Sequence, residues 1–302
     1  MKTYNLLIVF LLLVTGCSSN TGFAATSPTP QPASTSTPQP VIMPTMTQPA
    51  VFTPTLTPTT TLMPGSGHVI STPSQKDSEQ ITLGLLQTNN GCDLPCWWGI
   101  TPNQTNWKEA EELLKPFSYI TLRESATWSM YSVRSPLSEE YSEVDAVRMI
   151  FAVQQGVVKE IETGYFNEKT YHLSSFLQKY GVPSRVLVST YSSDSGMPKN
   201  QVPLSIDLYY PEKGINAWYA TDATVKGTQI YGCLERSPAL FLWSPNEHTQ
   251  SIDYILGWDK NYIPYMDVYD ATGLDVQGFY DKYKNPENEP CLQTPTNLWP
   301  GQ

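Results

Sequence analysis

The sequence predicts an α+β fold in which strands pair antiparallel and helices pack on one face of the sheet. Three observations lead to this class. The composition changes near residue 80, because all eight Trp lie beyond residue 90 and every charged residue except Lys2 lies at or beyond Lys76. Past that point, short helical periodicities alternate with strand-like runs. A helix followed by strand, turn and strand occurs twice, from Gly99 and from Tyr171, which predicts two related modules.

The first module is predicted to begin with a helix over residues 106–115. Trp107, Ala110 and Leu114 fall on one helical face, and Asn106 and Glu109 form a capping pair. Strands are expected over residues 119–123, 128–133, 144–153 and 157–165. The tripeptide 154–156 separates the last two runs and is typical of a hairpin turn.

The second module is predicted to begin with a helix over residues 171–180, which Gly181 and Pro183 end. Strands are expected over residues 185–191, 204–210, 215–219, 229–235 and 239–243. In the run 204–210, apolar residues alternate with polar ones, as in a strand with one buried face. Two later helices are expected over residues 247–256 and 272–283.

The N-terminus carries an export signal. One charge, Lys2, precedes an apolar run over residues 6–14, which is less than half the length of a membrane-spanning helix. The tetrad Val14-Thr15-Gly16-Cys17 resembles the lipobox of bacterial lipoproteins. The resemblance implies cleavage before Cys17 and diacylglycerol on its sulfur, which attaches the chain to the outer face of a membrane. An ordinary signal peptide, cut elsewhere, is the alternative.

The next segment is predicted to be a tether. Residues 18–75 contain no Asp, Glu, Lys or Arg and are rich in Pro and Thr, a composition that disfavours helices and sheets. We therefore expect residues 1–16 to be the signal peptide, residues 17–80 to be the lipidated cysteine and a disordered tether, and residues 81–302 to form an extracytoplasmic globular domain.

Four further cysteines lie in the expected domain: Cys92, Cys96, Cys233 and Cys291. An even number in an exported domain predicts two disulfides, for which three connectivities are open. We favour Cys92–Cys96, whose linker Asp-Leu-Pro is typical of a turn, together with Cys233–Cys291. A redox pair at Cys92 and Cys96 is the alternative, although the spacing is C-x3-C and not C-x2-C.

Two resemblances are carried by short motifs. Gly99-Ile100-Thr101-Pro102 and Tyr180-Gly181-Val182-Pro183 resemble turns in the helix-plus-sheet modules of outer-membrane assembly lipoproteins and of proteinaceous β-lactamase inhibitors. The segment 92–100, CDLPCWWGI, resembles the start of uncharacterised bacterial lipoproteins that have the same Pro/Thr tether. These resemblances imply an architecture and no activity.

Charge and motifs argue against several functions. Apart from Lys2 the chain has 17 basic and 28 acidic residues, which argues against a nucleic-acid partner. It lacks a G-x-S-x-G motif and a Gly-rich phosphate loop, and His172 and His248 are expected to be surface residues. We therefore predict no catalytic residue and no cofactor.

Carboxylates surround a glycine at Asp267, Asp270, Gly273 and Asp275, and calcium prefers such oxygen ligands. The spacing fits no EF-hand loop. We therefore predict no metal here, and instead a turn capped by Thr272 that leads into the last helix.

Two functions remain. The first is a non-enzymatic envelope lipoprotein that binds another envelope protein or a cell-wall component. The alternative is a carbohydrate-binding or glycan-cleaving surface protein, because Trp, Tyr and acidic residues are abundant. The alternative requires two or three Trp or Tyr exposed in a line beside carboxylates. The tryptophans concerned are Trp97, Trp98, Trp107, Trp128, Trp218, Trp243, Trp258 and Trp299.

Overall fold

The computed structural model describes residues 73–124, 128–138, 146–190, 198, 200–245 and 265–299. All of them belong to one unit of the chain, which begins at Gly67. The expected signal peptide, Cys17, the tether up to residue 72, and the helix predicted over residues 247–256 lie outside the described residues, as do His248 and Trp258.

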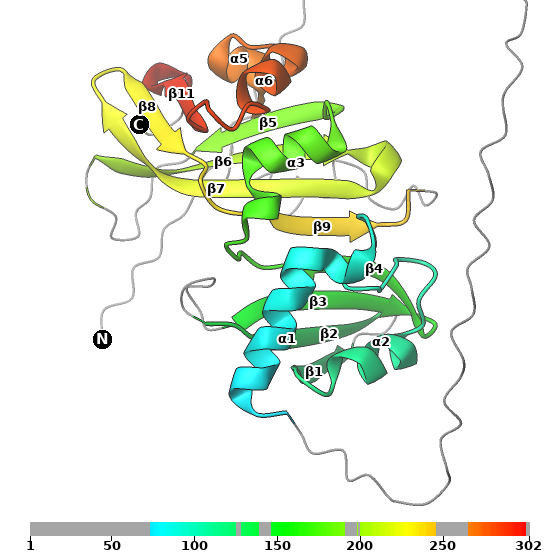
Figure 1. Ribbon diagram of the computed structural model, residues 1–302. Coiled ribbons are helices and arrows are strands. Elements are labelled where there is room, and N and C mark those ends of the chain that lie inside the picture. Colours follow the sequence, from blue (N-terminus) through cyan, green and yellow to red (C-terminus); the bar gives the residue numbers. More distant parts are fainter. Residues whose placement is uncertain are drawn as a thin grey trace, which may run out of the picture. The chain divides into compact units, whose positions relative to one another are not determined.

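One antiparallel sheet organises the described chain (Figure 1). Its order is β1-β2-β3-β4-β9-β7-β6-β5-β10, and β8 pairs with both β7 and β11. The strands are β1 (Tyr119–Glu124), β2 (Ser129–Pro136), β3 (Ala146–Gln154), β4 (Val157–Thr163), β5 (Arg185–Thr190), β6 (Gln201–Tyr210), β7 (Ile215–Lys226), β8 (Gln229–Cys233), β9 (Ala239–Trp243), β10 (Tyr265–Asp267) and β11 (Cys291–Pro295).

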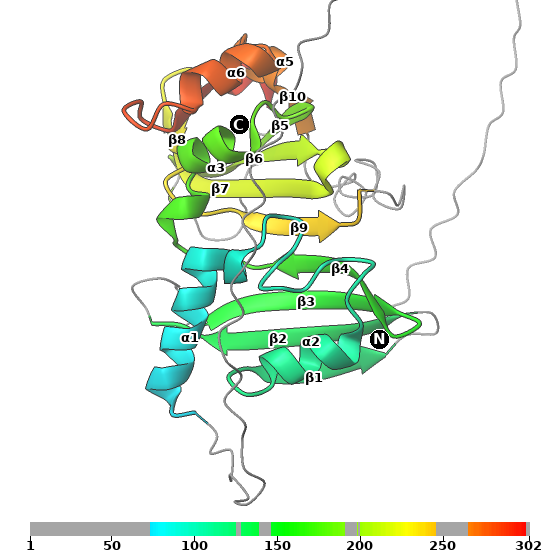
Figure 2. The same cartoon turned by 45° about the vertical axis from the view of Figure 1, so that its right-hand side comes forward.

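The helices are α1 (Gln75–Thr88), α2 (Trp107–Leu114), α3 (Leu173–Tyr180), α5 (Val268–Thr272) and α6 (Val276–Tyr283), with short 3₁₀ turns η1 (Asn89–Gly91), η2 (Lys169–Tyr171), η3 (Pro211–Lys213) and η5 (Thr296–Leu298). Figures 1 and 2 show α1 and α2 on the same side of β1–β4, and α3 on that side of β5–β7. The predicted α+β class, with an antiparallel sheet, is confirmed.

Two helix-plus-strand runs meet in the middle of this sheet. After α2, the chain runs β1-β2-β3-β4 from the edge of the sheet inward. After α3, strands β5, β6 and β7 also run inward, from near the opposite edge. Strand β4 pairs with β9, where Ile161 lies opposite Leu242, so the two runs share one sheet.

The core lies between the sheet and the helices. Trp107 of α2 packs on Phe151 of β3 and stacks on Tyr131 of β2, with ring centroids 5.6 and 3.8 Å apart. The hairpin from β3 to β4 turns at Gln155 and Gly156, both at positive φ, as a type I′ turn requires. The hairpin predicted from the tripeptide 154–156 between two strand-like runs is therefore confirmed.

Two predictions about the helices were wrong. Helix α1 was assigned in part to the tether, yet Ser74 and Asp77 form a reciprocal capping box that starts it at Gln75. The helix predicted over residues 272–283 begins four residues later, at Val276, and a separate short helix, α5, precedes it. Gly273 ends α5 at φ 78°, and Asp275, not Thr272, caps α6 through the N–H of Gly278.

Strand β6 also differs from its prediction. The sequence indicates one buried face, and Leu204, Ile206 and Leu208 are buried as expected. Ser205 and Asp207, which lie on the other face, are buried as well. Both faces of β6 are therefore buried at the centre of the strand, over residues 204–208.

Candidate functional site

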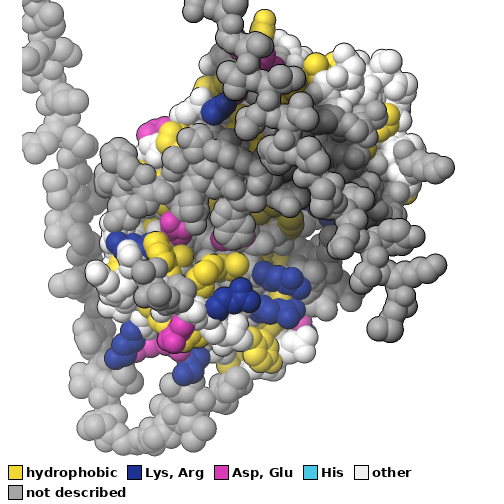
Figure 3. All heavy atoms as spheres, turned by 180° about the vertical axis from the view of Figure 1, so that it is seen from behind, with side chains coloured by type: hydrophobic (Ala, Val, Ile, Leu, Met, Phe, Trp, Pro, Cys, Tyr) yellow, Lys and Arg dark blue, Asp and Glu magenta, His cyan; other side chains and the backbone are white. Residues whose placement is uncertain are grey.

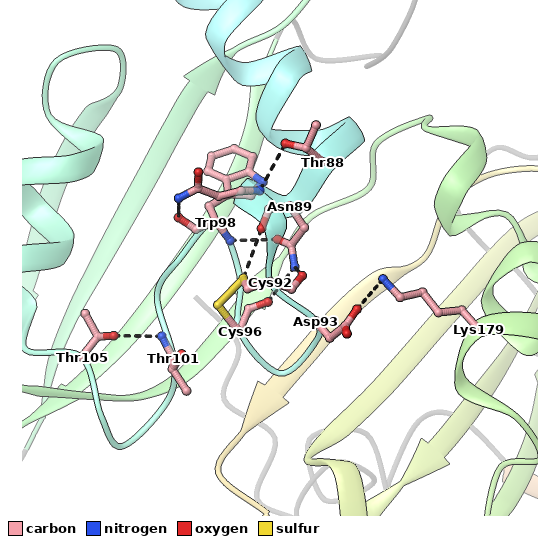
Figure 4. Close-up of a disulfide and its surroundings, with 10 residues drawn as sticks. Thr88, Asn89, Cys92, Asp93, Cys96, Trp98, Thr101, Thr105 and Lys179 are labelled. Carbon is pink, nitrogen blue, oxygen red and sulfur yellow. Dashed lines mark hydrogen bonds and ion pairs between the residues drawn. A yellow bond between two sulfur atoms is a disulfide. The ribbon is translucent and has the colours of Figure 1, made fainter. Parts of the chain in front are cut away.

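The loop after α1 is held by Asn89 (Figure 4). Its side-chain amide donates to the carbonyl oxygens of Cys92 and Cys96, each at 2.8 Å, and its Oδ1 accepts from the backbone N–H of Trp98 at 2.8 Å. The structure joins Cys92 to Cys96 inside this loop, and Asp93 forms an ion pair with Lys179 of α3 at 2.7 Å. These contacts indicate a structural role for the loop.

Trp97 and Trp98 follow the loop directly and are completely buried. Trp97 contacts Phe166 and Tyr171, with centroid distances of 5.8 and 5.7 Å, and its indole N–H points to the sulfur of Met149 in β3. The paired tryptophans of the CDLPCWWGI segment therefore fill the core.

The second disulfide closes the C-terminal end of the fold. Cys233 and Cys291 lie directly opposite each other in the β8·β11 pair and are joined. This is the connectivity that the sequence analysis favoured. The hydroxyl of Thr294 in β11 donates to the carbonyl of Ala271, and Trp299 donates to the Thr294 hydroxyl, which fixes the last strand against α5.

His172 lines a cavity of about 510 Å³ between the start of α3, the residues after β8 and the residues before β11. Burial lowers the pKa of its imidazole, and the neighbouring Glu168 opposes that shift. Its Nε2 lies 2.9 Å from the amide oxygen of Asn167, which can only accept, so this nitrogen carries the proton. Glu235 also lines the cavity.

The three aspartates around Gly273 have separate roles. Arg185 donates to both carboxylate oxygens of Asp267, at 2.8 and 3.0 Å, and this lowers the pKa of Asp267. Asp275 caps α6, and Asp270 is exposed on α5. Within the described ranges, no group of three or more His, Cys, Asp or Glu is placed to hold a metal ion.

The sheet face opposite the helices, which we call the outer face, carries side chains at matching register positions on successive strands. On its C-terminal half, Asp207 lies opposite Trp218, and Asn216 lies opposite both Tyr209 and Phe241. Trp243 stacks on Tyr209 at 5.9 Å, and Trp218 packs on Tyr165 at 5.6 Å. Aromatic rings therefore extend across three neighbouring strands.

Two carboxylates adjoin these rings on β4. Glu162 lies opposite Phe241, and Glu160 lies opposite Trp243. Burial raises the pKa of Glu162, and the charge of Glu160 raises it further. The alternation of β4 places these two on one face, which is a signal that the sequence contains.

Asp207 is a buried acid at the centre of the outer face. Burial raises its pKa to about 7, although the amide of Asn216 donates to its Oδ1 at 2.9 Å. Its Oδ2 and the indole nitrogen of the facing Trp218 are both buried and lack a hydrogen-bond partner among the residues that the structure describes. We expect this acid to be protonated over much of the range below neutral pH.

The N-terminal half of the outer face is positively charged. Arg134 of β2 lies directly opposite Arg148 of β3, and Tyr119 of β1 lies opposite Arg134. Arg123 is on the same face, opposite Met130. All three arginines are exposed, and Tyr119 is 76% exposed. Figure 3 shows cationic side chains gathered beside hydrophobic ones on this side of the molecule.

These arginines make no ion pair or side-chain hydrogen bond to any residue that the structure describes. They are three of the five arginines in an acidic chain, and they fall within 26 positions of sequence. Sequence analysis missed them because it did not determine which strand positions face one another.

Most described tryptophans are buried. Trp97, Trp98, Trp107, Trp243 and Trp299 are less than a tenth exposed, whereas Trp128 and Trp218 are partly exposed. An exposed line of tryptophans, which a sugar platform would need, is therefore not formed by the part of the chain that the structure covers.

Comparison with known proteins adds no relative. No family model, no curated protein and no solved structure matches this chain. Among the described helices, none has the length and apolar character needed to cross a membrane.

Proposed function

We propose that this chain is a lipid-anchored, extracytoplasmic protein of the cell envelope whose folded part binds another envelope component without chemical turnover. The N-terminal tetrad that ends at Cys17 and the uncharged tether support the anchor, and the two disulfides suit an oxidising compartment. The single observation that supports binding is the exposed outer face of β1–β3. Its arginines make no ion pair and no side-chain hydrogen bond to a described residue.

The anchor is tested by labelling cells with palmitate. The natural chain should take up the label and remain with the membrane fraction, whereas Cys17→Ala should lose the label. Ser18→Ala is the matched control and should behave as the natural chain does, since its substitution leaves the acylated sulfur in place. Label retained on the Cys17→Ala chain would contradict the proposal.

A carbohydrate-binding or glycan-cleaving function is the second candidate. The observation that favours it is the row of rings on β6, β7 and β9 beside Glu160 and Glu162. Two carboxylates of which one has a raised pKa are the groups that glycosidases use. Turnover of a glycan panel that disappears in Glu162→Gln, and persists in the exposed control Glu124→Gln, would establish this function in place of the first.

A further inference from the structure

We propose that the outer face of β1–β3 binds a linear phosphodiester polymer of the cell envelope through Arg134, Arg148 and Arg123. This inference rests on the proposed function, because it names the ligand of that binding face. It requires that the polymer and the folded part meet outside the cell.

The register of β2 and β3 places two arginines directly opposite each other. Residues directly opposite in an antiparallel pair have Cβ atoms about 5 Å apart, and like charges at such positions destabilise a sheet. Arg134 and Arg148 occupy such a pair, and no carboxylate among the described residues forms an ion pair with either of them. An unfavourable pair that the fold does not compensate is explained when an external anion bridges the two guanidinium groups.

The cations on this face have the chemistry that phosphate binding favours. The described cations on this face are all arginines, whose planar guanidinium groups bind phosphate through two parallel hydrogen bonds. Exposed hydroxyls lie among them, on Tyr119, Thr121 and Ser132. Tyr119 is directly opposite Arg134, and Ser132 is opposite Thr121. The hydroxyls of Tyr119 and Ser132 can donate to the remaining phosphate oxygens, whereas that of Thr121 already donates to the carbonyl oxygen of Ser132.

The arginines on β1–β3 lie in a narrow strip that suits an extended polymer. Arg123 is four residues along β1 from Tyr119, which corresponds to about 13 Å of strand, so the arginines form two separated positions for phosphate. Three adjacent strands make a strip about 10 Å wide. Glu160 and Glu162 on β4 border this strip on the same face. A flat anionic membrane would meet those carboxylates, whereas a thin chain would not.

Other carboxylates lie near in sequence. The connection between β2 and β3 includes Glu139, Glu140, Glu143 and Asp145, in residues that the structure does not describe. Their effect on the arginines is therefore measured directly, with a variant that removes three of them.

The binding experiment uses residues 18–302, which keep every described element and lack only the signal and the acylated cysteine. Without the lipid, any binding to vesicles reports the protein surface. The probe is purified poly(glycerol phosphate), measured by fluorescence titration at low and at high salt. Arg134→Gln/Arg148→Gln should weaken binding at least tenfold, because the variant loses the charge-assisted hydrogen bonds from both guanidinium groups to phosphate.

The matched control is Lys76→Gln/Lys108→Gln, which makes the same change in net charge on the helical side of the fold. It should bind as the natural chain does, and an equal loss there would show that net charge alone governs binding. Arg134→Lys/Arg148→Lys should bind more weakly than the natural chain but more tightly than the Gln variant. Equality with the natural chain would overturn the role of bidentate contacts.

Three further measurements complete the test. Glu139→Gln/Glu140→Gln/Glu143→Gln should bind the polymer equally or more tightly, and weaker binding would overturn the proposal. Binding that is as tight to phosphatidylglycerol vesicles, to polyglutamate or to single-stranded DNA as to the polymer would also overturn it. The palmitate experiment on Cys17 is independent of these, so a failure of the anchor and a failure of the ligand are told apart.

Discussion

The two halves of the outer face differ in whether their ionisable side chains are exposed or buried. On β1–β3 the arginines are exposed, and they lie directly opposite or near one another without an ion pair to described residues. On β6 and β7 the carboxyl of Asp207 is buried beside Asn216 and Trp218, and one of its oxygens has no hydrogen-bond partner in the described ranges. The first half carries two like charges at opposed positions, which is unfavourable within a sheet. The second half carries a buried carboxyl group whose pKa is raised, which favours its neutral form.

This difference indicates that one continuous sheet can present a binding face on its β1–β3 half and bury polar side chains on its β6–β7 half. Both halves bury their inner face against helices in a single core cluster. The outer positions of β1–β3 therefore contribute little to the core, and a binding face can occupy them. On β6 and β7 the outer positions of Asp207 and Asn216 are buried, where an ionised group is costly.

The first prediction concerns the residue that connects the halves. Trp97 packs on Met149 of β3 and on Tyr171, whose carbonyl accepts the hydroxyl of Tyr219 in β7. Trp97→Ala should lower the free energy of unfolding by about 3–5 kcal/mol, as truncation of a buried Trp does. Urea denaturation followed by circular dichroism measures this loss, and Tyr119→Ala, at an exposed position, should change it by less than about 0.5 kcal/mol.

A single cooperative transition is expected for Trp97→Ala, since the halves share one sheet and one core. If the variant unfolds in two separate transitions, the halves are independent units and the comparison between them describes two domains rather than one.

The sequence predicted those elements that have a strong local signal. The helices over 106–115 and 171–180 and the β3–β4 hairpin have clear periodicity or turn residues, and they lie close to where the structure has them. Helix α1 was missed because its 14 residues include few large apolar side chains and Gly84, and the buried positions Ser78 and Thr82 are polar. Only its capping box marks the start.

The candidate sites depended on information that the sequence holds only indirectly. Arg134 and Arg148 are 14 positions apart, and their opposition follows from the register of β2 and β3. Asp207 looks like the polar member of a half-buried strand, and only the structure shows that its side of β6 is buried. The composition alone could not show that Trp97 and Trp98 fill the core.

The second prediction concerns Asp207 and pH. Its pKa is raised from 3.8 to about 7, so the folded state binds this proton more tightly than the unfolded state does. Stability should therefore be highest below about pH 4 for this group, fall between about pH 4 and pH 7, and stay level above that range. The loss amounts to at most about 4 kcal/mol.

The measurement compares the natural chain with Asp207→Asn, which keeps an oxygen for Asn216 and cannot ionise. The difference in unfolding free energy between the two should grow in favour of the variant from pH 4 to pH 7. Asp222→Asn, at an exposed position of β7, serves as the control for the loss of one carboxyl group elsewhere on the same sheet. A constant difference for Asp207→Asn would show that its carboxyl is solvated.

The smallest predicted effect concerns stability at the arginine face, and it separates a binding role from a structural one. If Arg134 and Arg148 serve only the fold, replacing one of them should destabilise the protein or leave it unchanged. If they repel each other across the β2·β3 pair, Arg134→Thr should raise the free energy of unfolding by about 0.2–1 kcal/mol. The gain should shrink at high salt, because screening weakens repulsion between exposed charges.

Ser132→Thr, at the neighbouring exposed position of β2, measures the effect of the added β-branched side chain alone. A gain for Arg134→Thr beyond that of Ser132→Thr, lost in high salt and accompanied by weaker polymer binding, would mean that the sheet retains an unfavourable pair for its ligand. A loss of stability in Arg134→Thr would instead assign the arginines to the fold.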